Sequence, residues 1–524
     1  MLEDQTYSAL ETIVGPANIS QEPAILDTYA FQWGAESLNA VNDKPISRFY
    51  IRPAAVILPG STQEVQAIVK ACNRFKISFK AFSTGLGPWN CVSSEKSIQV
   101  DLRRMNRILK IDPKNMIAVV EPYVSGAQLQ SETIKFGLNC GMPGAGPQVS
   151  PLASATSMCG MGFTSAATGF AGRSVLGVEW VLPSGELLHL GSIGQKNNPD
   201  WFTGDGPGPS LRGIMRGFVG AKSGMGIFTK AAVKLYPFPS APEWKVRGES
   251  PFYEFEIPNY LKLHIINYED WDALALGLRR FEEEELGYMC YHLASIATLA
   301  GFAKTREELA GYIGKHAHRL KRPLTVLISA LSERELTYKE KVLEALVKET
   351  NGIDYTERLK IPSISLAEAL RCMFGFHGFL TTGSFQSTHG AMNSIDNSVR
   401  IAQLNIPLKK KYIAKKVIAD DRGEAVWIAS FERGHMTHME SPTPYVCNSE
   451  ESVRGMAEYA HECDEQDLTE HLGIPFFIIG DKQHEWFGPH CSNYHLWLRK
   501  IKEAFDPDNI ADPGFYISSR KENL

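Results

Sequence analysis

The chain has 524 residues, more than a single ordinary hydrophobic core accommodates, so two or more domains are expected. Hydrophobic residues make up 44% of the chain and charged residues 22%, as in ordinary soluble enzymes, and the formal net charge of −5 gives no electrostatic reason to expect nucleic-acid binding. No long apolar run marks a transmembrane segment and no signal-peptide pattern opens the sequence, so a cytoplasmic location is expected.

The chain opens with a mixed leader, residues 1–48, whose aromatic residues Tyr29, Phe31 and Trp33 either cover a pocket or pack on the body of the protein. Packing is the expected outcome. A short buried strand is then predicted over 54–58.

A helix follows this strand and opens with the capping box 61–64, in which Glu stands three residues after Ser. The strand predicted over 77–80 leads into the small-residue loop 81–87, a place where phosphate can bind. Two further strands are predicted over 97–102 and 117–122.

Residues 141–183 form the stretch around which the chain is organised. Most of it consists of Gly, Ala, Ser, Thr and Pro, and its only charged residue before the β-rich run 175–182 is Arg173. Small residues bury little area as a core helix, but they allow the backbone to approach a large flat ligand, where N–H groups and hydroxyls bind phosphates. A low-complexity linker would be more polar. The stretch therefore predicts a ligand-binding surface.

Five motifs stand in order along this half of the chain, and together they resemble the FAD-binding domain of the vanillyl-alcohol oxidase and p-cresol methylhydroxylase family. They are RPAAVILPGSTQEVQAIVKACN at 52–73, STGLG at 83–87, DLRRMNRILKIDP at 101–113, AVVEPYVSGAQL at 118–129 and SGMGIFTKAAVKLYP at 223–237. The resemblance covers roughly residues 50–240. No G-x-G-x-x-G follows a strand, so a Rossmann-type NAD site is not supported.

The resemblance implies a PCMH-type domain of two α+β subdomains that bind FAD between them. In the family the first loop and the Gly/Ser-rich stretch enclose the pyrophosphate of FAD. By position, that role falls to Ser83, Thr84, Gly85, Leu86, Gly87, Ser154, Thr156, Ser157, Gly160 and Gly162. Gly226 and Ile227 match a segment on the adenine side of the cofactor.

The predicted organisation is an N-terminal leader, an FAD-binding domain, a cap and a C-terminal segment, at residues 1–48, 49–240, 241–488 and 489–524. In the cap, strands over 264–268, 288–293 and 324–328 are separated by helical patterns, which predicts a ferredoxin-like antiparallel sheet and an α+β fold. Family members carry such a cap over the flavin ring. A last strand is expected over 475–479, and the ending at 506–514 resembles the family segment that returns to the FAD-binding domain.

The phrase 433–440 holds the densest group of candidate catalytic residues: Arg433, His435, His438 and Glu440. As a strand it places His438 and Glu440 on one face, whereas as a helix it pairs His435 with His438. Either arrangement builds an acid/base pair or a metal site, and ordinary hydrogen-bonded histidines are an equal alternative. Arg433 either holds a substrate carboxylate or lies on the surface. His377 and His389 are weaker candidates.

Departures from the family limit the choice of substrate. Phenol-oxidising members carry a tyrosine in the first loop where this chain has Leu86, the Tyr-Arg pair ahead of the C-terminal DP motif is missing, and related hydroxy-acid dehydrogenases carry an H-x-G-D-G-N motif that is absent here. A para-phenol substrate is therefore in doubt. Members that tether FAD through this loop use a histidine at the position of Thr84. Covalent attachment of FAD to a residue of the cap is the remaining alternative.

The nine cysteines are scattered and form no C-x-x-C, which argues against a metal cluster and fits a reducing cytosol. Electrons must then leave through an external acceptor: oxygen, a quinone or an electron-transfer protein. The predicted function is FAD-dependent oxidation of a small alcohol, hydroxy acid or activated aromatic side chain by hydride transfer to flavin N5. The alternative is a flavoprotein electron-transfer subunit of a larger redox complex. An acceptor protein or a second copy of the chain are the partners considered.

Overall fold

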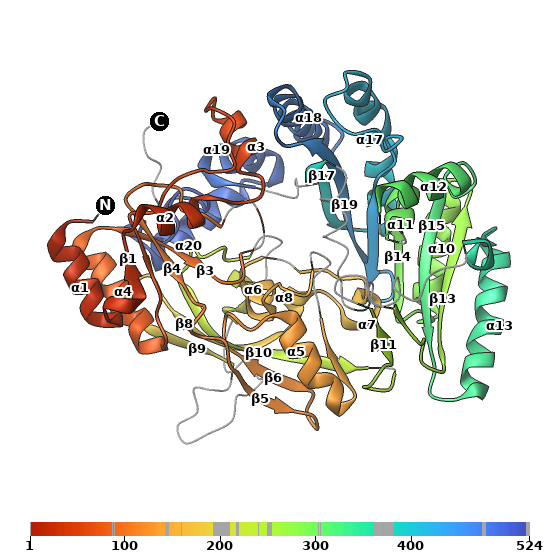
Figure 1. Ribbon diagram of the computed structural model, residues 1–524, viewed down its shortest axis with the longest axis horizontal. Coiled ribbons are helices and arrows are strands. Elements are labelled where there is room, and N and C mark those ends of the chain that lie inside the picture. Colours follow the sequence, from red (N-terminus) through yellow and green to blue (C-terminus); the bar gives the residue numbers. More distant parts are fainter. Residues whose placement is uncertain are drawn as a thin grey trace.

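A computed structural model describes the chain over residues 2–85, 87, 90–141, 146–158, 160–191, 210–215, 220–238, 240–248, 254–301, 303, 305–359, 370, 382–473 and 478–519. Two bodies lie side by side, one built from the first half of the chain and one from β13 to α18 (Figure 1). The C-terminal helices return to the first body (Figure 1).

The first sheet has four strands in the order β1-β2-β4-β3, with β2 and β3 both parallel to β4. Its strands are β1 (Ile19–Ser20), β2 (Ala55–Ile57), β3 (Ser78–Phe82) and β4 (Ser97–Asp101). Helix α4 (Thr62–Phe75) crosses over between β2 and β3, and its buried face carries Val65, Ile68, Val69 and Cys72. The predicted capping box is formed in part: Ser61 Oγ caps the helix by accepting the Glu64 N–H at 3.2 Å, but the Glu64 carboxylate accepts the N–H of Gly60, one residue before the N-cap, at 2.8 Å.

The second sheet is antiparallel, in the order β5-β6-β10-β8-β9, with β7 paired to the end of β10. The strands are β5 (Ile108–Asp112), β6 (Ile117–Val120), β7 (Leu138–Cys140), β8 (Val175–Val181), β9 (Leu187–Leu190) and β10 (Ile227–Pro237). Trp180 is fully buried beneath this sheet and stacks on Phe228 and Phe505. The sheet therefore shares its core with a C-terminal helix.

The described part of the Gly/Ser-rich stretch contains three short helices. They are α6 (Pro151–Thr156), α7 (Ser165–Thr168) and α8 (Ala171–Ser174), and α5 (Gly126–Thr133) precedes them. Ser150 caps α6, accepting the Ala153 N–H at 3.2 Å. Because each helix is only one to two turns long, it does not need a long apolar face, and small residues are sufficient to pack it.

The cap holds a seven-stranded sheet, β16-β13-β15-β14-β18-β19-β17, in which every pairing is antiparallel. Its first four strands are β13 (Leu261–Tyr268), β14 (Met289–Leu293), β15 (Arg322–Ser329) and β16 (Ile353–Asp354). Their spatial order, fourth-first-third-second, together with helices α10 (Trp271–Glu283) and α13 (Glu333–Glu349), is ferredoxin-like. This confirms the predicted fold class.

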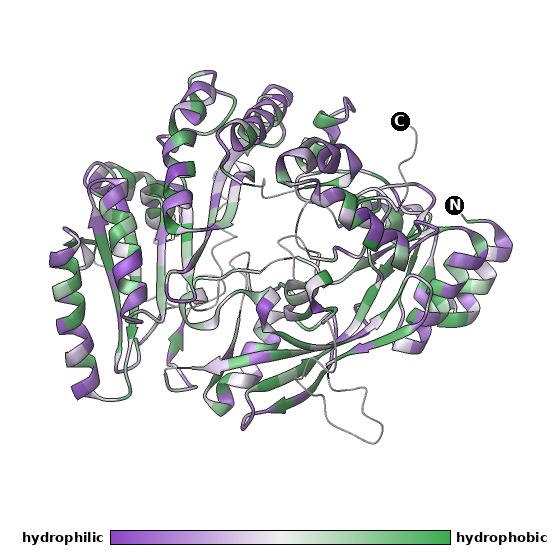
Figure 2. Ribbon diagram, turned by 180° about the vertical axis from the view of Figure 1, so that it is seen from behind, coloured by the Kyte–Doolittle hydropathy of each residue, from purple (hydrophilic) through white to green (hydrophobic). Residues whose placement is uncertain are grey.

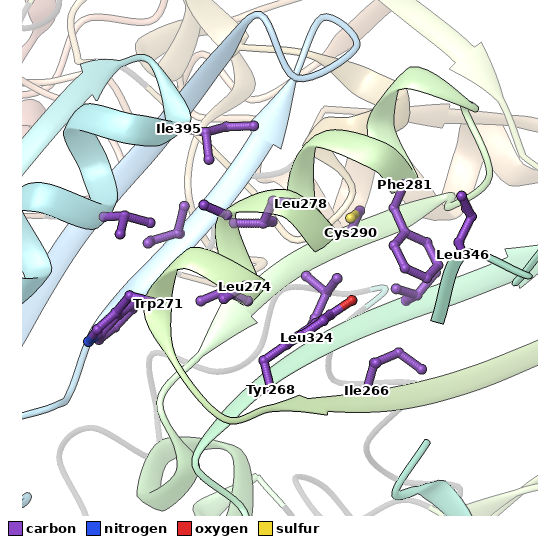
Figure 3. Packing of buried hydrophobic residues seen from close by; sticks show 14 of the residues in the cluster. Ile266, Tyr268, Trp271, Leu274, Leu278, Phe281, Cys290, Leu324, Leu346 and Ile395 are labelled. Carbon is purple, nitrogen blue, oxygen red and sulfur yellow. The ribbon is translucent and has the colours of Figure 1, made fainter. Parts of the chain in front are cut away.

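A second β-α-β-β-α run extends the sheet: β17 (Gly383–Asn393), α17 (Ile395–Ala414), β18 (Trp427–Phe431), β19 (Met436–Val446) and α18 (Glu450–Thr469). Helices cover one face of the sheet, where Leu274, Leu278 and Phe281 of α10 pack near Cys290 and Leu324 (Figure 3). Hydrophobic residues are frequent in β13, β14 and β15, whereas helix α13 carries many hydrophilic residues (Figure 2). The opposite face of the sheet is turned toward the first body.

The chain ends against the first sheet. After α19 (Gly480–Phe487) and α20 (Tyr494–Phe505), the Phe79 N–H donates to Ile510 O at 2.9 Å and the Asp512 N–H donates to Phe79 O at 3.0 Å. The Lys80 ammonium forms a buried ion pair with Asp512. The predicted strand over 475–479 lies mostly outside the described residues.

The leader joins the first sheet through β1 and contributes α1 (Asp4–Val14), α2 (Pro23–Ala30) and α3 (Ala35–Val41). The remaining elements are α9 (Arg212–Met215), β11 (Val246–Arg247), β12 (Glu254–Phe255), α11 (Ser295–Ala300), α12 (Arg306–His316) and α14 (Thr356–Leu359). Among the described helices, none combines the length and apolarity that crossing a bilayer requires.

Candidate functional site

The loop after β3 is held by two contacts from elsewhere in the first body. The Ser83 hydroxyl donates to the carbonyl of Pro122, and Thr84 Oγ1 accepts the Ser150 N–H at 3.1 Å. The loop turns through Gly85 and Gly87, whose φ angles of +79° and +99° lie in the left-handed region that favours glycine. Leu86 lies outside the described residues.

The Gly/Ser-rich stretch lies beside the segment that leads into β10. The N–H groups of Ala221 and Lys222 donate to the carbonyls of Thr156 and Ser157 at 3.0 and 3.1 Å. Gly226 has φ +107°, and a Cβ there would lie 2.3 Å from the Val181 carbonyl oxygen. The Thr84 hydroxyl and these backbone hydrogen bonds therefore bring together the three segments that the sequence assigns to the cofactor.

The donor set of these segments fits a diphosphate. Residues 83–87 and 150–164 carry hydroxyls and backbone amides and no acidic side chain. Within the described part of the chain, the N–H groups of Gly85, Gly160 and Gly162 donate to no protein acceptor. Such groups, together with glycines that admit close approach, are what an anionic ligand requires.

His438 and Glu440 lie on one face of β19, as the strand reading predicts. His438 Nε2 is 3.3 Å from Glu440 Oε2, and the Ser387 hydroxyl on the neighbouring strand β17 donates to the other carboxylate oxygen. The Trp427 ring stands edge-on to the His438 ring, with centroids 4.9 Å apart. The pair is therefore oriented from two neighbouring strands.

This face of the cap sheet is turned toward the Gly/Ser-rich stretch. Phe163, which directly follows Gly162, places its ring 4.4 Å from the ring of Tyr291 on β14 and 5.4 Å from that of Trp427 on β18. The Ser165 hydroxyl donates to Ser430 O at 3.3 Å. The same stretch that contacts the segment before β10 thus also contacts the strands beside His438.

Arg433 and His435 lie elsewhere, on the exposed turn between β18 and β19. Arg433 Nε bonds Glu285 Oε1 at 2.5 Å beyond the end of α10, and the Arg433 side chain is 73% exposed. The helical alternative, in which His435 shares a face with His438, is wrong because 436–446 is a strand. The catalytic roles of Arg433 and His435 stay predictions, and both residues lie at the surface.

His389 points to the helix-covered side of the sheet, and His377 lies outside the described residues. A register shift between Ser387 and Gly390 leaves His389 in a bulge, where its Nδ1 is 2.9 Å from Asp467 Oδ1 of α18. Burial alone would lower the pKa of His389, but Cys463 and Asp467 together raise it well above its ordinary value. His389 is therefore part of the scaffold behind Glu440.

Ser387, Trp427 and Phe163 were missed by sequence reasoning. Ser387 stands 53 residues from Glu440, and only the pairing of β17 with β19 brings them together. The spacing of residues along one segment carries no signal for such a contact. Within the described residues, no group of three or more His, Cys, Asp or Glu side chains is arranged to hold a metal ion.

Comparison with known proteins decides the cofactor. A family model described as an FAD binding domain matches residues 53–191. The chain therefore carries an FAD-binding domain, and it is similar to FAD-linked oxidoreductases such as p-cresol methylhydroxylase. FAD is its cofactor. The resemblance drawn from the five motifs is confirmed.

Sequence relatives match a little over a third of the chain. The chain is 31% identical to probable mitochondrial D-lactate dehydrogenase of Danio rerio, over 36% of each chain. It is 29% identical to the flavoprotein subunit of 4-cresol dehydrogenase (hydroxylating) of Pseudomonas putida, over 37% of each. The sequence matches thus span little more than a third of these relatives.

Solved structures of the family share the fold over nearly the whole chain. The p-cresol methylhydroxylase structure with bound substrate has a TM-score of 0.75 at 17% identity, over 98% of this chain and 96% of that one. The 4-ethylphenol oxidase of Gulosibacter chungangensis has a TM-score of 0.73 at 18% identity, over 98% and 97%. Cap and FAD-binding domain therefore have the family fold.

Proposed function

We propose that the protein is an FAD-dependent oxidoreductase that dehydrogenates a small organic substrate between the Gly/Ser-rich stretch and the His438 face of the cap sheet. The observation that carries this is the packing of Phe163 against Tyr291 and Trp427, beside the His438–Glu440 pair. An acid/base pair of the cap thus lies next to the Gly/Ser-rich stretch that is proposed to bind FAD. The curated relatives, which are FAD-linked dehydrogenases, support the same class of reaction.

The cofactor residues proposed for FAD are those of the first loop, the Gly/Ser-rich stretch and the segment before β10. Thr84, Ser154, Thr156 and Ser157 supply hydroxyls, and the glycines around them supply amides and room. Gly226 and Ile227 belong to the third segment. When bound, FAD supplies an acceptor for two electrons as hydride.

His438 and Glu440 are proposed to take the proton that the substrate hydroxyl loses as its carbon gives up hydride. With Nε2–H donating to Glu440, the basic nitrogen of the neutral His438 ring is Nδ1. The Glu440 carboxylate stabilises the imidazolium electrostatically once the proton arrives. The Ser387 hydroxyl holds the carboxylate in place, and the Trp427 ring limits rotation of the imidazole.

The proposed substrates are alcohols, 2-hydroxy acids or activated aromatic side chains, and electrons leave to an external acceptor. Relatives that are named as dehydrogenases of D-lactate and of 4-cresol, together with a D-2-hydroxyglutarate dehydrogenase of Stutzerimonas stutzeri that is 27% identical, support these substrate classes. Leu86, which stands where phenol-oxidising members carry a tyrosine, sets the chain apart from that pattern.

A screen for anaerobic bleaching of the flavin tests the proposal. Purified protein would be mixed, without oxygen, with 2-hydroxy acids of both configurations and with benzylic alcohols, and the flavin absorbance near 450 nm followed. Loss of that absorbance with one compound class is the expected result. Protein that contains FAD but is bleached by no member of either class, while accepting electrons from a protein donor, would support an electron-transfer subunit instead.

A further inference from the structure

Residues 30–50, near the end of the leader, contact both the chain that follows the loop after β3 (residues 83–87) and the cap. This segment lies outside the matched FAD binding domain at 53–191. We call it the bridge segment. Hydrogen bonds join the two ends of this segment: the Gln32 N–H donates to Arg48 O at 3.1 Å, and the Tyr50 N–H donates to Ala30 O at 2.9 Å. An antiparallel bridge between Phe31 and Phe49 joins the same two arms.

One side of the bridge segment holds the chain that follows the flavin loop. Gln32 is buried, and its Oε1 accepts the N–H groups of both Asn90 and Cys91 at 2.9 Å. The Asn90 amide in turn donates to Gly87 O at 2.5 Å. Gln32 is thus connected through one residue to the loop proposed to bind the pyrophosphate.

The other side of the bridge segment holds the edge of the cap sheet. The Trp33 indole N–H donates to Phe385 O at 3.0 Å, and Arg48 donates to Gly383 O at 2.9 Å, both on β17. Glu36, almost fully buried in α3, accepts the Tyr445 hydroxyl of β19 at 2.7 Å. In Figure 1, α3 lies between the first body and α18.

We propose that Gln32 is a positioning residue of the cofactor site: by holding Asn90 and Cys91, and through Asn90 the carbonyl of Gly87, it keeps the loop after β3 in place for FAD. The proposal rests on the proposed role of residues 83–87 in FAD binding. A single acceptor atom that satisfies two consecutive backbone N–H groups fixes the chain direction directly after the loop. Without it, the buried N–H of Cys91 and the part-buried N–H of Asn90 lose their partner, and the loop relaxes away from the cofactor.

Two substitutions at Gln32 distinguish the effect of its hydrogen-bond acceptor from the effect of its side-chain volume. Gln32→Leu removes the acceptor at similar volume, whereas Gln32→Glu keeps an oxygen that accepts both N–H groups. The readouts are the FAD content of the purified protein, the rate of FAD loss on dilution, and two temperatures measured on heating: the rise of flavin fluorescence and the loss of secondary structure.

The expected result is an effect on the cofactor that exceeds any effect on folding. In Gln32→Leu, FAD loss accelerates about tenfold or more, and flavin fluorescence rises several degrees before the protein unfolds. In Gln32→Glu, as in the parent protein, the two temperatures coincide. The temperature gap reports loop opening even where FAD is tethered to the cap.

Trp33→Phe is the matched control, because it removes the neighbouring hydrogen bond to β17 and keeps an aromatic ring; its FAD retention is expected to match the parent. Asn90→Ala tests the same link from the other side and keeps the inference testable if Gln32→Leu fails to fold. Its expected effect is premature flavin exposure.

Three outcomes overturn the proposal: unchanged flavin retention in both Gln32→Leu and Asn90→Ala, equal losses in Gln32→Leu and Trp33→Phe, or lowering of both temperatures together. Parent protein without flavin would instead refute the proposed function.

Discussion

Thr84 accepts a hydrogen bond of 3.1 Å from the backbone N–H of Ser150, although 66 residues separate them. This contact joins the loop after β3 to the start of the Gly/Ser-rich stretch, and so it joins the two segments proposed to enclose the FAD pyrophosphate. The site therefore depends on small residues that allow close approach, more than on any single charged group.

Replacing Gly160 with a bulky residue tests that dependence. The parent protein is expected to be yellow, with one FAD per chain. Gly160 is buried, so the side chain in Gly160→Leu occupies space needed by the cofactor, and the variant should lose most of its flavin. Gly311→Leu is the control, because Gly311 is exposed on α12 and a Cβ there meets nothing within 4 Å. Flavin released after denaturation gives the ratio, and equal ratios would show the loop is misplaced.

Gly226 is expected to tolerate no side chain. With φ +107° and a Cβ position 2.3 Å from the Val181 carbonyl, Gly226→Ala combines backbone strain with a clash against backbone. A loss of about 2 kcal/mol or more, together with lower FAD affinity, should follow. Gly314→Ala, in helix α12 with nothing within 4 Å, should be neutral or stabilising by about 0.5–1 kcal/mol. Thermal unfolding of both variants measures the difference, and a stable Gly226→Ala would contradict the clash.

Local features of the site could be predicted from the sequence. The helix cap that Ser61 provides to the Glu64 N–H depends on residues three apart, and the shared face of His438 and Glu440 depends on the two-residue period of a strand. Both were correct because the interacting residues are close in the chain. The ferredoxin-like antiparallel sheet of the cap also followed from alternating strand and helix patterns.

Contacts that depend on register or on packing between the two bodies could not be predicted. Ser387 reaches Glu440 only because a bulge shifts the register of β17, and Phe163 reaches Tyr291 only because the two bodies pack together. The separation of His435 from His438 likewise depends on where the turn ends and β19 begins. None of these contacts can be predicted from the spacing of residues within one segment.

His292 should make the protein less stable in mild acid. It is fully buried on β14, its Nδ1 lies 2.8 Å from the Pro323 carbonyl, and burial lowers its pKa to about 4. The unfolded chain binds this proton near pH 6.5, so the contribution of His292 to stability is complete above about pH 6.5 and is lost as the pH falls toward 4. The loss approaches about 1.4 kcal/mol per pH unit.

The apparent unfolding temperature measured between pH 7 and pH 5 tests the effect of His292. His292→Gln is expected to show a smaller decrease over this range than the parent protein, even though its unfolding temperature at pH 7 is lower. His461→Gln, on the exposed surface of α18, is the control and should follow the parent. Equal pH dependence in His292→Gln and the parent would show that His292 is not the group that titrates.

Turnover is expected to need an external acceptor. No C-x-x-C or other cluster-binding cysteine set is visible in the sequence, so reduction inside the chain should end at the flavin. Anaerobic protein should stay reduced after substrate addition until oxygen, a quinone or an artificial acceptor dye is supplied. Iron and acid-labile sulfide in stoichiometric amount in the isolated chain would contradict this.

The His438–Glu440 pair is expected to control the rate of flavin reduction and not FAD binding. His438→Ala should keep its FAD and reduce it about 10²-fold or more slowly with any substrate found in the bleaching screen, because the proton acceptor is gone. Ser387→Ala, which leaves the pair but removes the hydrogen bond to Glu440, should show a smaller loss. His461→Ala serves as the control.

Stopped-flow measurements at several pH values separate these effects, and a chelator tests the metal alternative. If a divalent metal polarised the substrate oxygen instead, chelation would abolish reduction and added metal would restore it. Under the proton-transfer proposal the chelator has no effect, and the rate in the parent protein depends on a titrating group whose influence disappears in His438→Ala. Parent-like reduction rates in His438→Ala would leave His438 as an ordinary buried, hydrogen-bonded histidine.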